Sequence, residues 1–189
     1  MGISGLMKII STKRVNLSDL SKFKVIGIDT SIWLHKCKYA DGCELANNIN
    51  DSGWLNSFKA IFSEISKTSS LVFVFDGKTP DIKLVEHNNR RNGFDKMHEV
   101  ALKLLEIPQM KHEGKRMLVK LIEVSDLSSK LQTMIDEQGW GRVSADFEAD
   151  TLLASMALQG KIDLIITNDT DLVVYGCENI VSLFLILAF

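Results

Sequence analysis

The sequence predicts an α/β fold with a mostly parallel central sheet flanked by helices. Three short apolar runs support this prediction, because they are rich in β-branched and aromatic residues and occupy residues 24–28, 71–75 and 163–167. Continuous runs of this kind are typical of strands that are buried on both faces. Amphipathic segments separate the runs, and strands that alternate with helices form parallel sheets with right-handed crossovers.

The helices are predicted from apolar residues at helical spacing. Between the first two strands, apolar residues from Trp54 to Ile65 recur every three to four positions, which predicts a helix over residues 52–67. The same pattern predicts helices over residues 121–135 and 149–158. These segments supply the layers that cover the sheet.

The stretch from Pro80 to Gly139 is too long for one crossover between neighbouring strands. Its first part contains helix-forming residues with a weak apolar stripe, which Gly93 interrupts. We therefore expect a helical insertion over residues 84–118 that stands off the sheet. The alternative is an ordinary pair of surface helices.

Composition and charge narrow the classes of partner. The chain has 189 residues, of which 46% are hydrophobic and 24% charged, and this is typical of one soluble domain with a packed core. The net charge of −2 excludes a basic surface over the whole domain. Residues 78–130, however, contain 11 Lys and Arg against 8 Asp and Glu, so a basic segment lies within an acidic remainder.

The three cysteines, Cys37, Cys43 and Cys177, form no C-x-x-C pair, and we expect reduced thiols in a nuclear or cytoplasmic protein. The sequence opens without a secretory signal, and Leu6 stands where myristoylation requires Ser or Thr. The apolar C-terminal run is too short to span a bilayer, so we expect no membrane partner.

Acidic residues gather at the predicted strand ends. Asp29, Asp76 and Asp169 each follow a strand, and ligands bind beyond the carboxyl ends of strands in open parallel sheets. Asp171 follows closely, and Glu148 with Asp150 opens the helix before the third strand. Each acid taken alone is more often a turn residue or a helix cap, but the whole set is hard to explain in that way.

Six carboxylates in one crevice would repel one another, because two charges about 4 Å apart cost about 4 kcal/mol at an effective dielectric near 20. Bound cations would relieve this repulsion. All-oxygen ligands suit Mg²⁺ or Mn²⁺, and two such ions can activate water and stabilise a leaving oxygen in phosphoryl displacement. The sequence therefore predicts a two-metal phosphodiesterase centre.

Four motifs, in this order, resemble those of a known family. The segments are Met1–Leu6 (M-G-I-x-G-L), residues 74–77 (V-F-D-G), 148–150 (E-A-[DE]) and 167–172 (T-x-D-x-D-L). They are similar to the structure-specific 5′ nucleases of the XPG type, which include flap endonucleases and 5′→3′ exonucleases. The resemblance runs from Met1 to about Val181, and residues 28–36 favour the exonuclease branch.

The resemblance implies a PIN-like nuclease core over residues 1–181, with residues 84–118 as a helical arch. It assigns the six acids as ligands of two Mg²⁺ ions, with Mn²⁺ as an alternative. The substrate it implies is DNA with a 5′ flap, a 5′ end or a junction between single and double strands, in nuclear repair or replication. Whether a sliding clamp binds stays open.

The resemblance also implies contacts with DNA. Lys83 and Arg90 match a basic pair that acts on the scissile phosphate, so they are the expected catalytic residues. Gly2, His35 and Arg91 are the expected DNA-binding residues, and His35 would stack on a base beside the cut. The alternative for His35 is an ordinary helix residue on a partly buried face.

Two features depart from the family. The family continues with another strand, a further Asp ligand and a helical hairpin that grips the duplex, whereas residues 182–189 form an apolar tail unlike family sequence. We expect a C-terminally truncated nuclease with an exposed, aggregation-prone tail. Asp146 stands where the family usually has proline.

Three functions are therefore open. The first is a metal-dependent 5′ nuclease acting on DNA. The second is a catalytically weak DNA-binding fragment with the same fold. The third is a phosphatase or phosphotransfer domain, which needs one nucleophilic Asp and leaves the other acids and the basic pair unexplained.

Overall fold

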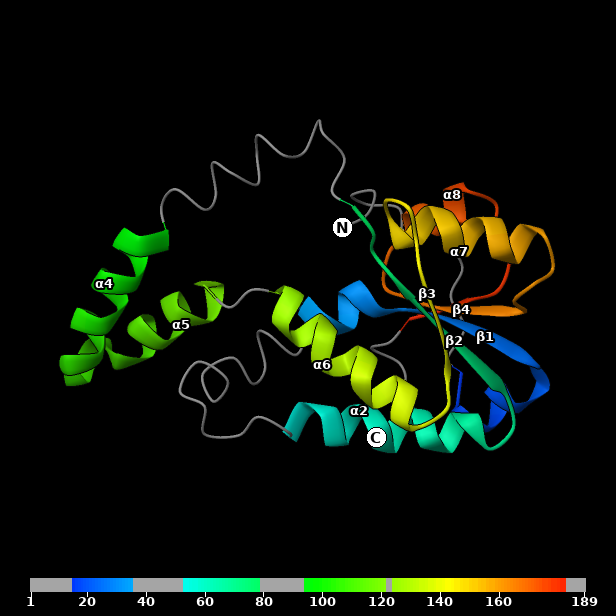
Figure 1. Cartoon of the computed structure of the whole chain (residues 1–189), viewed down its shortest axis with the longest axis horizontal. Helices are drawn as coiled ribbons and strands as arrows, with labels where there is room; N and C mark the ends of the chain where they lie inside the picture. The colour runs from blue at the N-terminus through cyan, green and yellow to red at the C-terminus, as the bar shows by residue number, and fades with distance from the viewer. Residues whose placement is uncertain (1–14, 36–52, 79–93, 122–123, 183–189) are drawn as a thin grey trace. The chain divides into compact units, whose positions relative to one another are not determined.

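The computed structural model describes residues 15–35, 53–78, 94–121 and 124–182 (Figure 1). The chain divides into two compact units. The first comprises residues 1–33, 58–78 and 132–189, and the second comprises residues 34–57 and 79–131. In the described ranges, no helix is both long enough and apolar enough to cross a membrane.

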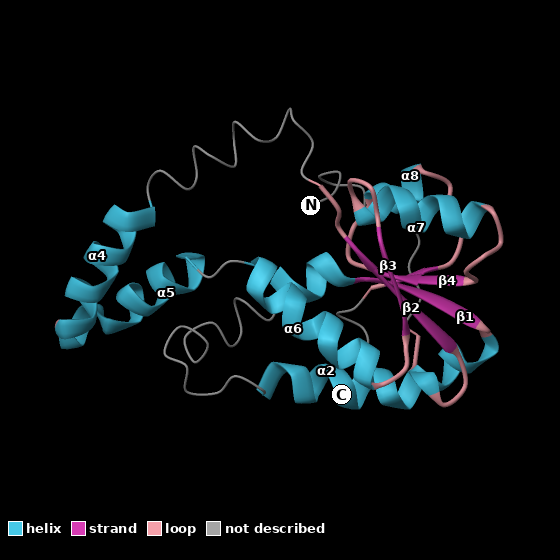
Figure 2. Cartoon of the chain, viewed as in Figure 1, coloured by secondary structure: helices cyan, strands magenta, loops and turns pink. Residues whose placement is uncertain are grey.

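The described part of the first unit contains a five-stranded parallel sheet in the order β3-β2-β1-β4-β5 (Figure 2). The strands are β1 (Val25–Asp29), β2 (Ser70–Phe75), β3 (Gly141–Ser144), β4 (Leu164–Ile166) and β5 (Ile180–Val181). The predicted parallel α/β sheet is confirmed, since β1, β2 and β4 are the three apolar runs. The edge strands β3 and β5 are additions to it.

An aromatic layer covers one face of the sheet. Helix α2 (Gly53–Ser66) matches the predicted helix 52–67. Its residues Phe58 and Phe62 pack on Phe73 of β2, with ring centroids 5.4 and 5.2 Å apart. Trp33 meets the ring of Phe58 edge-on at 5.0 Å. These rings are buried, so this face carries a large part of the core.

Helix α7 (Ala149–Leu158) packs on the opposite face, as Figure 1 shows, and has the predicted bounds. Val74 points to this face because it alternates with Phe73, and it packs in one cluster with Leu153 of α7. A Cβ atom on Gly27 of β1 would lie 2.8 Å from Leu153 Cδ2. Glycine at this position therefore allows α7 to approach the central strand closely.

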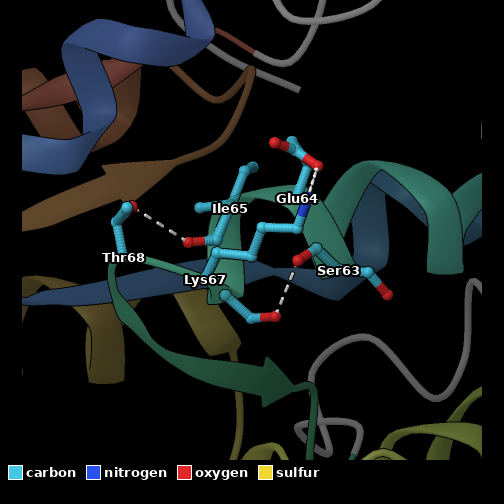
Figure 3. A network of polar contacts seen from close by, with 6 residues as sticks. Ser63, Glu64, Ile65, Lys67 and Thr68 are labelled. Carbon is cyan, nitrogen blue, oxygen red and sulfur yellow. Dashed lines mark hydrogen bonds and ion pairs between the residues drawn. The ribbon is translucent and has the colours of Figure 1, made fainter.

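Local hydrogen bonds and an ion pair form at the C-terminal end of α2 (Figure 3). Ser66 Oγ donates to the carbonyl of Ser63 at 3.0 Å, and Thr68 Oγ1 donates to that of Ile65 at 3.4 Å. Lys67 forms an ion pair with Glu64 at 2.5 Å. These contacts end the helix and lead directly into β2.

The second unit contains a pair of helices, α4 (Phe94–Glu106) and α5 (Lys111–Leu121), joined by the 3-10 turn η3 (Pro108–Met110). A Cβ atom on Gly114 would lie 2.8 Å from the carbonyl oxygen of Ala101, so the two helices approach closely at this point. The later part of the expected insertion is therefore helical, and α5 continues beyond it to Leu121. Residues 84–93 of the expected arch lie outside the described residues.

The remaining elements are α6 (Val124–Glu137), α8 (Asp171–Val174) and the 3-10 helix η2 (Leu17–Lys22). Helix α6 corresponds to the helix predicted over residues 121–135. It ends at Glu137 and is followed by Gly139, whose φ of 68° is readily adopted only by glycine, and Trp140 N donates back to the carbonyl of Ile135 at 3.1 Å. The expected tail, residues 182–189, lies outside the described residues from residue 183 onwards.

Candidate metal centre

The carboxyl edge of the sheet brings the predicted acids to one place. Asp29 is the last residue of β1, Asp76 follows the end of β2, and Asp169 comes shortly after β4. Glu148 is the N-cap of α7, and Asp150 lies in its first turn. All of these strands are parallel, so their carboxyl ends share one edge.

Asp29 is the most enclosed of these acids, with 7% of its surface exposed. Thr167 Oγ1 donates to Asp29 Oδ2 at 2.8 Å, and Ser31 N donates to Oδ1 at 3.0 Å. The pKa of Asp29 is raised to about 6: burial is the largest cause, the carboxylates of Asp76 and Asp169 add to it, and the two hydrogen bonds oppose it. The strand-end acids therefore influence one another electrostatically.

Asp76 connects β2 to the start of α7. Its Oδ1 accepts a 2.8 Å hydrogen bond from the backbone N–H of Ala149, the first residue of α7. Its Oδ2 accepts a 2.5 Å hydrogen bond from Ser31 Oγ. The N-cap residue Glu148 makes no side-chain cap, so Asp76 supplies the acceptor and the negative charge that a helix N-terminus favours.

The acids on α7 and α8 belong to the same electrostatic cluster. Burial raises the pKa of Asp150, and the carboxylates of Glu148, Asp169 and Asp76 raise it further. The pKa of Tyr175 is also raised, first by the carboxylate of Asp150 and then by burial and the other acids nearby. Carboxylates from three chain segments thus act on one another across this edge.

Asp171 has an unsatisfied oxygen. Its backbone N–H donates to Asp169 Oδ1 at 3.0 Å, but its own Oδ1 is buried and has no hydrogen-bond partner among the described residues. A buried oxygen of this kind is costly to leave unpaired. A cation ligand site would supply its missing partner.

The donor set fits a hard divalent cation, because it consists of carboxylate oxygens. The pKa values of Asp29 and Asp150 are raised, and Asp171 Oδ1 has no hydrogen-bond partner among the described residues. In the part of the chain that the structure describes, however, no three His, Cys, Asp or Glu side chains are arranged so that they could hold an ion. Several oxygens are engaged elsewhere, as in the contact from Ser31 to Asp76. Binding an ion would therefore require these side chains to reorient.

The other predicted site residues are placed less fully. His35 is exposed and lies in a helical segment that is described over residues 30–35. Gly2, Lys83, Arg90 and Arg91 lie outside the described residues.

Two contributors to the site were missed at the sequence level. Ser31 and Thr167 hold the strand-end acids, although only the position of Thr167 within the T-x-D-x-D-L motif offered a signal. Thr167 is 2% exposed, and its Oγ1 also accepts a 3.0 Å hydrogen bond from the backbone N–H of Asp169. It therefore links the acids of β1 and β4.

Comparison with known proteins gives two domain matches. Residues 1–96 match the XPG N-terminal domain, and residues 139–186 match the XPG I-region. Exodeoxyribonuclease 1 of Schizosaccharomyces pombe is 27% identical over 190 residues, covering 95% of this chain and 32% of that protein. Flap endonuclease 1 of Saccharomyces cerevisiae is 30% identical over 189 residues, covering 93% of this chain and 48% of that protein.

Solved structures show the same fold. The catalytic core of Rad2 in complex with DNA substrate has a TM-score of 0.60 at 20% identity, covering 94% of this chain and 46% of that one. Human GEN1 in complex with Holliday junction DNA has a TM-score of 0.62 at 18% identity, covering 95% and 39%. A GEN1 structure with product DNA and Mg²⁺ has a TM-score of 0.60 at 18% identity, covering 96% and 36%. The chain spans about a quarter to a half of the length of the curated relatives it matches.

Proposed function

This chain belongs to the XPG nuclease family, and we propose that it hydrolyses phosphodiester bonds in DNA that carries a 5′ flap, a 5′ end or a strand junction. The observation that carries this proposal is the electrostatically coupled set of acids at the carboxyl edge of the sheet. In an α/β sheet this edge is where ligands bind. A phosphatase needs one nucleophilic acid, and that does not account for such a set.

The proposed ligands of two Mg²⁺ ions are the acids Asp29, Asp76, Glu148, Asp150, Asp169 and Asp171. When bound, such ions supply positive charge to the phosphodiester and to the attacking water. Hydroxyl groups keep two of these acids at the edge of the sheet, since Thr167 Oγ1 donates to Asp29 and Ser31 Oγ donates to Asp76. The N-terminus of α7 adds a favourable field for anions beside Asp76.

The proposed contacts with DNA follow the family pattern. Lys83 and Arg90 would bind the phosphate that is cut, while Gly2, His35 and Arg91 would hold the strand nearby. A cation on the transferring phosphate acts mainly in the transition state. We propose that the protein acts in DNA repair or replication in the nucleus, or in the cytoplasm if its source has no nucleus.

The direct test is cleavage of a 5′-flapped duplex, labelled at its 5′ end, by the 189-residue chain with Mg²⁺ and with EDTA. We expect Mg²⁺-dependent release of short 5′ products and loss of that activity in Asp169→Asn. The matched control is Glu137→Gln, an exposed acid at the end of α6, which should cleave like the wild type. Equal activity in Asp169→Asn and wild type would refute the ligand assignment.

Lys83→Ala and Arg90→Ala should each reduce the single-turnover rate by about 10²–10³, because one lost donor to a transition-state charge costs that much. DNA affinity should change much less. Single-turnover kinetics at saturating enzyme measure the chemical step, and fluorescence anisotropy measures binding. An unchanged rate with weaker binding would make the pair ordinary phosphate contacts.

A second candidate is a DNA-binding protein without cleavage. It is favoured by the absence, within the described ranges, of three acids already arranged to hold an ion. The same assay separates the two functions: flap binding without any Mg²⁺-dependent product supports this candidate and excludes the first.

A further inference from the structure

A hollow of about 540 Å³ lies beside the proposed metal centre. It is lined by Asp76, Gly77, Lys78, Ser144, Ala145, Asp146 and Phe147. This volume falls within the range of about 300–1,000 Å³ that is usual for small-molecule sites. Because Asp76 lines it and Phe147 directly precedes Glu148, the hollow adjoins two of the proposed ligands.

Main-chain contacts hold the walls of the hollow in place. Gly77 N donates to the carbonyl of Phe147 at 2.6 Å, and Lys78 N donates to that of Asp146 at 3.0 Å. A Cβ atom on Gly77 would lie 1.9 Å from the carbonyl oxygen of Ala145, so only glycine permits this approach. The side chains of Lys78 and Phe147 therefore project from anchored backbone.

The side chains of Lys78 and Phe147 are not part of the buried core. Phe147 is 58% exposed, the largest exposed fraction of any aromatic side chain among the described residues. Lys78 is exposed and makes no ion pair with a described residue. An exposed ring offers its face to an unpaired base, and a nearby ammonium group offers a partner to phosphate.

We propose that this hollow is a nucleotide subsite, in which Phe147 stacks on an unpaired base and Lys78 binds a phosphate of the same strand. The proposal rests on the proposed nuclease function and extends it. Since the hollow is bounded by Asp76 and by the neighbour of Glu148, the nucleotide that it receives adjoins the bond that is cut. Stacking of this kind is tolerant of sequence, so any base can occupy it.

Asp146 also lines the hollow, and its negative charge opposes phosphate nearby. It therefore favours a pose in which the phosphate lies toward Lys78 and the base lies toward Phe147. Asp146→Asn should strengthen DNA binding at low ionic strength, while Lys78→Ala should weaken it. An increase in DNA affinity from one variant and a decrease from the other would indicate that both side chains of the hollow contact the DNA.

The test measures flap binding by fluorescence anisotropy, with Ca²⁺ in place of Mg²⁺ and a gel to check that the DNA stays intact. A series of flapped duplexes carries one abasic nucleotide at successive positions around the junction. We expect one position at which the abasic nucleotide weakens wild-type binding about tenfold. Phe147→Ala should weaken binding of the intact flap to the same extent, with no further loss at that position.

Two variants serve as controls. Phe147→Tyr keeps the ring and should keep the wild-type pattern. Leu158→Ala removes another exposed apolar side chain, 64% exposed at the far end of α7, and should change nothing. Circular dichroism shows whether each variant is folded.

The proposal is overturned if no abasic position loses its effect in Phe147→Ala, or if the folded wild type does not bind the flap at all. Cleavage with Mg²⁺ is measured on the same preparations. If the protein cleaves the flap but Phe147→Ala does not cancel the effect of any abasic position, the subsite is refuted and the nuclease function is supported. If Phe147→Ala cancels the effect of one abasic position but no cleavage occurs, the nucleotide-binding site is supported and the nuclease function is refuted.

Discussion

At the residue scale, the buried acid Asp29 of the proposed site reduces the stability of the folded protein. Its pKa of about 6, against 3.8 for a free aspartate side chain, results mainly from burial. Below about pH 4 this group is protonated in the folded and the unfolded chain alike, whereas above about pH 6 the folded protein must hold a buried charge. Asp29 therefore lowers stability as the pH rises through this window.

In EDTA, the free energy of unfolding should fall between about pH 4 and pH 7, by up to about 3 kcal/mol from this one residue. Asp29→Asn should flatten the profile, as urea unfolding at several pH values would show. Asp136→Asn is the opposite control, because the hydrogen bond with Arg142 lowers the pKa of Asp136. Parallel profiles for wild type and Asp29→Asn would contradict the assignment of a buried, neutral-pH acid.

Thr167 tests whether the acids are held in place by a neutral hydroxyl. Thr167→Val keeps the shape but removes the donor to Asp29 and the acceptor for the N–H of Asp169. Leaving these buried groups unpaired should destabilise the protein by about 1–3 kcal/mol. Thr167→Ser keeps the hydroxyl and should cost less. A Thr167→Val variant as stable as the wild type would show that these hydrogen bonds do not contribute to stability.

At the scale of elements, helix α7 depends on an acid from another strand. Asp76 accepts the N–H of Ala149 from 73 positions away in sequence. Asp76→Ala should lose this cap at a cost of about 0.5–2 kcal/mol, while relief of charge repulsion offsets part of it. Asp76→Asn keeps an acceptor without the charge, so in EDTA it should be the more stable of the two variants in urea unfolding. The reverse order would mean that Asp76 does not cap α7.

Which elements could be predicted depends on how much apolar surface each one buries. Strands β1, β2 and β4 lie in the interior of the sheet and show as continuous apolar runs. The edge strand β3 is largely exposed and is held by backbone pairing with β2, so its side chains carry no strand pattern. Strand β5 has two residues and α8 has four, so neither is long enough to show the periodic spacing of apolar residues that identifies a strand or a helix.

The same distinction applies to the site. Strand-end acids could be predicted, because parallel topology gathers carboxyl ends at one edge. The hydroxyls of Ser31 and Thr167, and the capping role of Asp76, could not, because each pairs residues that are distant in sequence. Asp146 and Phe147 drew no functional prediction, since their hollow exists only through the close approach at Gly77.

At the scale of the whole molecule, the unit that contains the sheet has its acids at the carboxyl edge of the sheet and a core of packed aromatic rings. A ligand that binds only the folded chain stabilises it by mass action. Divalent cations that neutralise this edge should therefore raise the unfolding temperature, independently of any cleavage. Screening by salt acts on exposed charges more than on buried ones such as Asp29.

Mg²⁺ at ten times its dissociation constant should stabilise the folded chain by about 1.4 kcal/mol, which corresponds to a rise of about 3–6 °C in Tm. Tryptophan fluorescence follows the transition, since Trp33 and Trp140 both contact the aromatic layer of the sheet unit. Asp171→Asn removes the charge at the orphaned buried oxygen and should lose most of the rise, whereas Glu137→Gln should keep it. NaCl at matched ionic strength accounts for screening. If NaCl reproduces the full rise, or if Asp171→Asn responds like the wild type, the ions do not bind at this edge, and the acids are a strained surface rather than a metal centre.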